Sequence, residues 1–147
     1  MKKIESAKRT KERRIYITET DAARLKEMIS VNREVNGENE PLLCKLEEKL
    51  DSVRLCHAEN ISERVVTMNT VSRVMFSNTE GETVFWLGYP HAINYDGKKL
   101  SILTPIGVAL LGSRVGDSVE WETPAGCGEL IVKDILYQPE ACGDYHL

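Results

Sequence analysis

Residues 104–117, TPIGVALLGSRVGD, carry the clearest helix start and stop signals in the chain. Thr104 is a good N-cap, and Pro105 suits the first helical position, where its missing N–H leaves no donor unsatisfied. Gly112 can adopt the left-handed backbone conformation that ends many helices. These signals predict a short helix over residues 106–111, followed directly by a turn.

The segments after this helix have the patterns of two strands. In residues 118–122, Val119 and Trp121 alternate with polar side chains, which is typical of a strand with one buried face. Residues 123–128, TPAGCG, are predicted to be a turn-rich connection. Residues 129–137 then form a second strand, because they are rich in Leu, Ile and Val.

Strands are also expected before the helix. Residues 72–77 and 83–89 are predicted strands, and residues 78–81 (NTEG) between them predict a hairpin turn. Residues 100–103 lead into the helix that starts near Pro105. The C-terminal part is therefore predicted to be a small antiparallel β-sheet with one short helix against it, an α+β unit.

The N-terminal part contains two helical patterns. Residues 14–18 (RIYIT) predict a short strand, and Thr18 or Thr20 can cap a helix over about residues 21–35. A second helix is predicted over about residues 42–56. The apolar positions repeat at spacings of three and four residues: Leu25, Met28, Asn32 and Val35 in the first helix, and Leu43, Leu46, Leu50 and Val53 in the second.

These two seams predict a short antiparallel helical hairpin, or coiled coil, whose base docks on the sheet. The alternative is that the two helices pack separately on the sheet. The chain is thus predicted to divide into a basic leader with a helical hairpin, residues 1–60, and a C-terminal domain, residues 61–147.

Charge is unevenly distributed along the chain. The 147 residues carry a net charge of −4, and the first 14 (MKKIESAKRTKERR) carry +5, which leaves −9 on the rest. A basic leader on an acidic body can contact nucleic acid or an acidic protein surface. No aromatic side chain is interleaved for stacking on bases, so a solvated N-terminus is favoured and direct DNA binding is not expected.

Composition and cysteine spacing exclude several classes of protein. Hydrophobic residues make up 41% of the chain, which is enough for a core, but no apolar run approaches the roughly 20 residues of a membrane span. No apolar segment follows the first five residues, so a cytoplasmic location is expected. The cysteines have neither zinc-ligand nor disulfide spacing and are predicted to be reduced, partly buried thiols: Cys44, Cys56, Cys127 and Cys142.

No motif for nucleophilic catalysis or phosphate binding is present. His91 follows a proline in a predicted loop without an obvious relay partner, and Asp144 and His146 are neighbours that do not make a triad. Carboxylates that could hold Mg²⁺, which prefers oxygen ligands, gather around the predicted tip of the hairpin: Glu34, Glu38 and Glu40.

Three stretches resemble the Gre family of transcript cleavage factors. Residues 104–117 contain Pro-Ile, Leu-Leu-Gly and Gly-Asp in the order found in the C-terminal domain of that family. Residues 65–76 (VVTMNTVSRVMF) and the ending YQPEACGDYHL are most similar to its short Rnk branch, the regulators of nucleoside diphosphate kinase. The resemblance implies an FKBP-like C-terminal domain, although the aromatic pocket of the prolyl isomerases is missing.

The resemblance also implies a partner. Gre factors dock on the rim of the RNA polymerase secondary channel, and this role carries over to Leu103, Thr104, Pro105 and Ile106. Many Gre factors have an acidic residue where this chain has the apolar Leu103, so the docking surface is expected to keep its place and change its chemistry.

Gre factors stimulate cleavage with an acidic pair at the end of a long coiled coil. Here the tip, with Glu38 and Glu40, does not reproduce that motif, and the predicted arm is far shorter. The chain is therefore expected to be a monomeric, non-enzymatic regulator that binds RNA polymerase, with no cofactor, metal or membrane partner. Two alternatives stay open: a short cleavage factor whose Glu38 or Glu40 reaches a metal, and an FKBP-like module with another protein partner.

Overall fold

The computed structural model describes residues 15–35, 39–94 and 96–145, and the basic leader and Glu38 lie outside this part. The elements follow one another as β1 (Tyr16–Thr18), α2 (Glu19–Val35), α3 (Glu40–Ser52), β2 (Arg54–Cys56), the 3₁₀ turn η2 (Ala58–Asn60), β3 (Val71–Phe76), β4 (Thr83–Gly88), β5 (Lys99–Ser101), α4 (Pro105–Leu110), β6 (Ser118–Thr123) and β7 (Gly126–Tyr137). The α+β fold and the two N-terminal helices are confirmed.

Five strands form one curled, mixed sheet in the order β5-β4-β3-β7-β6. The β3–β4, β3–β7 and β6–β7 pairs are antiparallel, as predicted. The β4–β5 pair is parallel, with Leu87 opposite Leu100, and this departs from the all-antiparallel expectation. Ten residues separate β4 from β5, so the chain can return to the start of β4 and pair with it in the same direction. A tight turn would allow only antiparallel pairing.

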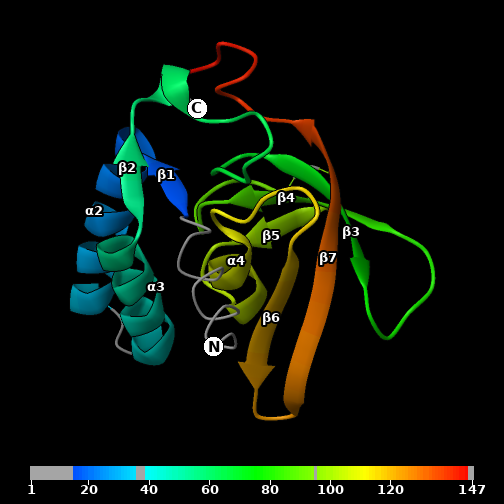
Figure 1. Ribbon diagram of the computed structural model, residues 1–147. Coiled ribbons are helices and arrows are strands. Elements are labelled where there is room, and N and C mark those ends of the chain that lie inside the picture. Colours follow the sequence, from blue (N-terminus) through cyan, green and yellow to red (C-terminus); the bar gives the residue numbers. More distant parts are fainter. Residues whose placement is uncertain (1–14, 36–38, 95, 146–147) are drawn as a thin grey trace, which may run out of the picture.

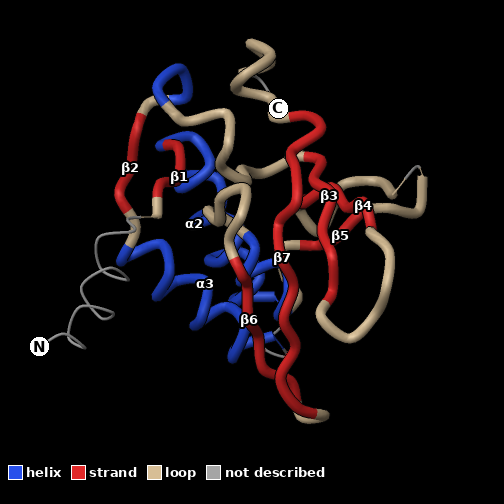
Figure 2. The backbone as a smooth tube through the Cα atoms, turned by 45° about the vertical axis from the view of Figure 1, so that its right-hand side comes forward, coloured by secondary structure: helices blue, strands red, loops and turns tan. Residues whose placement is uncertain are grey.

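The helices and the small β1–β2 pair gather on one side of the five-stranded sheet (Figure 2), and α4 lies between the hairpin and this sheet (Figure 1). Leu25, Leu43 and Leu46 of the hairpin are fully buried in the same hydrophobic core as Leu87 and Leu130 of the sheet. The predicted docking of the hairpin on the rest of the chain is thus observed, while the division into residues 1–60 and 61–147 stays a prediction.

The second helix is shorter than predicted. Val53 is extended (φ −89°, ψ 166°), so α3 ends at Ser52, and residues 54–56, predicted to be helical, form β2 instead. This strand pairs in parallel with β1, with Tyr16 opposite Arg54 and Thr18 opposite Cys56. The helical spacing of apolar residues predicts the structure correctly as far as Leu50. Beyond it, pairing with β1, which is distant in sequence, outweighs the local preference for helix.

The apolar seam of α2 also differs from the prediction. Ala22, Leu25 and Ile29 are buried, whereas Asn32, which was placed in the seam, donates from Nδ2 to the carbonyl oxygen of Met28 at 2.9 Å. The helix starts at Glu19 because the Oγ1 of Thr18 accepts a hydrogen bond from the backbone amide of Asp21 at 3.0 Å.

The segment TPAGCG is mostly strand rather than a turn-rich connection, because β6 runs to Thr123 and β7 begins at Gly126. The glycine at position 128 has a packing reason. A Cβ atom there would lie 2.3 Å from the Trp121 ring, so only glycine lets the indole cross the neighbouring strand. The long β6–β7 hairpin that results extends beyond the rest of the sheet (Figure 2).

Candidate functional site

The loop before α4 has the cap geometry that its sequence predicts. The Oγ1 of Thr104 accepts a hydrogen bond from the amide of Gly107 at 3.0 Å and donates to the carbonyl oxygen of Ser101 at 2.7 Å. Pro105 occupies the first helical position, and Gly112 has φ +84° just past the end of the helix. The loop is therefore held rigidly at the start of α4.

The four predicted docking residues are not equally accessible. All four are half-buried, and the side chains of Leu103 and Ile106 pack partly against the core. Pro105 lines a surface groove of about 590 Å³ between α3, α4 and β6. We call this the Pro105 groove. Its apolar lining includes Leu42, Ala109 and Trp121, and its acidic side chains are Glu48, Glu120 and Glu122.

Lys49, a residue that the sequence did not single out, ties the hairpin to α4. Its ammonium donates to the carbonyl oxygens of Val108 and Ala109, at 2.7 and 3.1 Å, and burial lowers the pKa of Lys49 to about 8. A cation at the C-terminal end of a helix interacts favourably with its unpaired carbonyls. The position of Lys49 between Leu46 and Leu50 does not predict this contact with α4, because most lysines on helices are solvated.

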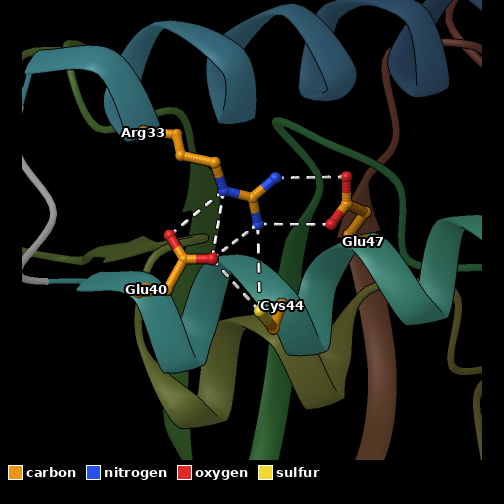
Figure 3. Close-up of polar contacts among 4 residues, drawn as sticks. All are labelled: Arg33, Glu40, Cys44 and Glu47. Carbon is orange, nitrogen blue, oxygen red and sulfur yellow. Dashed lines mark hydrogen bonds and ion pairs between the residues drawn. The ribbon is translucent and has the colours of Figure 1, made fainter.

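At the other end of the hairpin, Arg33 joins the two helices (Figure 3). Its Nε donates to both carboxylate oxygens of Glu40 at 3.1 Å, and its Nη1 and Nη2 donate to Glu47 at 3.3 and 3.2 Å. The thiol of Cys44 donates to Oε2 of Glu40 at 3.2 Å. Four side chains from α2 and α3 thus form one polar cluster, the Arg33 cluster.

The Arg33 cluster changes the chemistry of the predicted tip carboxylates. Hydrogen bonds from Arg33 lower the pKa of Glu40, and the hydrogen bond to Glu40 raises the pKa of the Cys44 thiol. Glu34 is exposed on α2, and Glu38 lies outside the described residues. Within the described part of the chain, no three His, Cys, Asp or Glu side chains are arranged to hold a metal ion.

Asp21 is a second group whose role the sequence did not reveal. Its carboxylate is buried, and it accepts hydrogen bonds from the amide of Met68 at 3.1 Å and from the hydroxyl of Tyr89 at 3.5 Å. Burial raises the pKa of Asp21 to about 7. Asp21 stands at the start of the helix predicted over residues 21–35, where the favourable interaction of a negative charge with the helix N-terminus is enough to account for an aspartate.

The remaining candidates for chemistry that lie in the described part of the chain do not assemble a catalytic site. His91 is exposed and stacks on Tyr89, with ring centroids 5.9 Å apart. Asp144 accepts a hydrogen bond from Tyr137, and its predicted neighbour His146 lies outside the described residues. All four cysteines are free thiols. The prediction that they are partly buried is right for Cys56 alone, because Cys44, Cys127 and Cys142 are exposed.

None of the helices in the described ranges has both the length and the apolar character needed to cross a membrane. This agrees with the absence of a long apolar run in the sequence.

Comparisons with known proteins converge on one family. Residues 61–137 match the family described as "Transcription elongation factor, GreA/GreB, C-term". The "Regulator of nucleoside diphosphate kinase" of Escherichia coli K12 is 46% identical over 110 residues, which are 73% of this chain and 79% of that protein. Transcription elongation factor GreA of Beijerinckia indica is 26% identical over 106 residues, which are 72% of this chain and 68% of that protein.

The same relationship holds among solved structures. A prokaryotic transcription elongation factor GreA/GreB from Nitrosomonas europaea superposes with a TM-score of 0.70 at 32% identity, and the alignment covers 84% of this chain and all of that one.

Proposed function

The chain belongs to the GreA/GreB family of transcription elongation factors, and from this premise we propose that it is a non-enzymatic regulator that binds RNA polymerase at the rim of the secondary channel. It would act in the cytoplasm, where transcription takes place, and compete there with other factors for the same channel. Its relative in E. coli is named for nucleoside diphosphate kinase, so we include the expression of that enzyme among the proposed targets.

The proposed contact is the loop Leu103–Ile106 with the adjoining Pro105 groove. A rigid, capped loop beside an apolar groove loses little conformational entropy when a partner binds, and this favours affinity. Half-buried apolar side chains such as Leu103 and Trp121 are of the kind that dominate binding energies at interfaces.

The single observation that carries the absence of cleavage is the Arg33 cluster. Glu40 is a predicted tip carboxylate whose hydrogen bonds the structure describes. The guanidinium of Arg33 donates to both of its oxygens. A carboxylate in such a pair is less available to a catalytic Mg²⁺, since the cation has to displace the arginine. The arm is also short: α2 and α3 have 17 and 13 residues, or about 25 and 20 Å at 1.5 Å per residue.

The experiment that tests the proposal is a pull-down of core RNA polymerase by the full chain, with a purified Gre factor as competitor. We expect the polymerase to be retained on the chain and to be released as the Gre factor is added. Retention that a Gre factor does not reduce would place the contact elsewhere. No retention at all would favour the alternative of an FKBP-like module with another partner.

A further inference from the structure

The Pro105 groove lies next to the point where the basic leader joins the described chain. Ile15, the first described residue, packs so closely on Gly112 that a Cβ atom there would lie 2.4 Å from Cγ2 of Ile15. Ile15 also lines a second cleft, of about 370 Å³, at the C-terminal end of α4. This cleft shares Lys49, Ala109 and Glu120 with the Pro105 groove, so the two form one continuous path along the surface.

The side of the groove formed by β6 is negatively charged. Glu120 and Glu122 are exposed on β6, Glu48 faces them from α3, and no ion pair joins any of the three carboxylates to another residue of the described ranges. Glu129 lies directly opposite Glu120 in the β6–β7 pair and adds like charge.

The two lysines that line the groove do not balance this charge. The ammonium of Lys49 is buried against the carbonyl oxygens of α4, which leaves Lys45 as the lining cation that is exposed. The leader, in contrast, carries seven Lys or Arg against two Glu. The cleft beside Ile15 is balanced, with Lys49 and Arg114 against Asp117 and Glu120. The charge of the leader is therefore opposite to that of the β6 side of the Pro105 groove, further along the path.

We propose that residues 1–14 bind in cis along the Pro105 groove and compete there with RNA polymerase. The competition with polymerase rests on the proposed function, whereas the contact between leader and groove does not. Fourteen residues reach about 46 to 50 Å when fully extended, which is ample for a groove that starts near Ile15. Attachment at the rim gives the leader a local concentration on the order of millimolar, so a weak electrostatic contact is enough to keep it bound.

Trp121 in the groove gives a direct readout. The full chain is labelled with 5-fluorotryptophan, and its two fluorine resonances are assigned with Trp86→Phe. The labelled chain is compared with a full-length variant in which the seven basic residues of the leader are replaced by Gln: Lys2, Lys3, Lys8, Arg9, Lys11, Arg13 and Arg14. We expect the resonance of Trp121 to shift and that of Trp86 to stay. Salt at about 0.5 M should cause the same shift in the natural chain, because it screens the contact.

A synthetic peptide of residues 1–14, added to the neutralised variant, should restore the original resonance of Trp121. The response should be lost when Glu120→Gln and Glu122→Gln are also present. The matched control is Glu63→Gln with Glu80→Gln, which removes the same charge at exposed positions outside the groove and should leave the response intact. A Trp121 resonance that ignores the leader, salt and peptide overturns the proposal.

Polymerase binding is measured separately. If the leader covers the groove in about nine molecules of ten, the neutralised variant should bind core polymerase about tenfold more tightly than the natural chain. If neither chain binds polymerase, the proposed function fails, while the Trp121 measurement still decides on the cis contact. Weaker polymerase binding by the neutralised variant contradicts the competition, since the leader is then part of the polymerase contact. RNA retention that depends on the leader, with Trp121 unmoved, assigns the leader to nucleic acid instead.

Discussion

The carboxylate of Asp21 accepts a hydrogen bond from the backbone amide of Met68, 3.1 Å away and 47 residues further along the chain. Both residues are almost completely buried. The bond fastens the first turn of α2 to the segment that leads into β3. It is also one of the bonds that fix the hairpin relative to the sheet, at the end opposite to the Arg33 cluster.

Asp21 makes the stability of the fold depend on pH. Burial raises its pKa to about 7 in the folded chain, with Glu140 adding to the rise and Met68, Arg24 and Tyr89 opposing it. An unfolded aspartate titrates near 3.9, so between these values the folded state binds more protons than the unfolded state. The free energy of unfolding should therefore decrease as the pH rises from about 4 to 7, by about 2 to 4 kcal/mol from this residue, and then level off.

The substitution Asp21→Asn tests this assignment. The amide mimics the protonated carboxyl, since its oxygen can still accept from Met68, and it does not ionise. Urea unfolding of the variant should show a smaller decrease between pH 5 and 8, and at pH 8 the variant should be at least as stable as the parent. Equal pH dependence in both chains would assign the titration to another group.

Leu46→Asp should unfold the protein or lower its melting temperature sharply. Leu46 is fully buried in the shared core, and an ionised carboxylate without a partner costs several kcal/mol there. The neighbouring exposed position provides the control, because Glu48→Asp should change stability by less than about 0.5 kcal/mol. Equal thermal melts for Leu46→Asp and the parent would contradict the packing of α3 on the sheet.

Leu103→Asp probes the proposed docking loop without removing the Thr104 cap or Pro105. The side chain is half-buried against the core, so a lower melting temperature is expected along with a folded circular dichroism spectrum. Polymerase binding should weaken by at least about thirtyfold, which corresponds to about 2 kcal/mol for an interface hot spot. Leu136→Asp makes the same change at an exposed leucine of β7 and should bind normally. A folded Leu103→Asp chain that binds like the parent would remove the loop from the contact.

The chain should not shorten the RNA of a backtracked elongation complex. The short arm and the pairing of Glu40 with Arg33 are the reasons. RNA length is followed on a sequencing gel, with a purified Gre factor as positive control. Clear cleavage that disappears in Glu38→Ala with Glu40→Ala would instead support the short cleavage factor.

The Arg33 cluster predicts the reactivity of Cys44. The hydrogen bond to Glu40 raises the pKa of this thiol, and the thiolate is the form that reacts with alkylating agents. Glu40→Gln should therefore speed the alkylation of Cys44 by iodoacetamide at pH 8, as followed by mass spectrometry. Cys127, exposed on β7, is the internal control whose rate should be the same in both chains. No acceleration at Cys44 would show that Glu40 does not control the thiol.

The features predicted well from sequence depend on short-range signals. Thr104, Pro105 and Gly112 define α4 because a cap, a first-turn proline and a left-handed glycine act within one helical turn. The β3–β4 hairpin was found for the same reason. The docking role of residues 103–106 is a proposal that comes from the resemblance to the Gre family, whereas the geometry of this loop was predictable from these local signals.

The features that were missed depend on residues far apart in the chain. β2 exists because it pairs with β1, and a three-residue strand has no pattern of its own. Asp21, Lys49 and Arg33 look like ordinary helix-surface residues until the fold brings Met68, the end of α4, and Glu40 with Glu47 to them. Their roles follow from three-dimensional contacts, which propensity and spacing do not encode.

The parallel β1–β2 pair closes the base of the helical hairpin, and this has an evolutionary consequence. The segment between Thr18 and Arg54, which contains α2 and α3, begins and ends at this pair of strands. Seven residues added to each helix at its tip would lengthen the arm by about 10 Å and leave both the base and α4 undisturbed. The length of the arm can therefore change by insertion or deletion without disturbing the C-terminal sheet and α4, so proteins with long arms and proteins with short arms can share one fold.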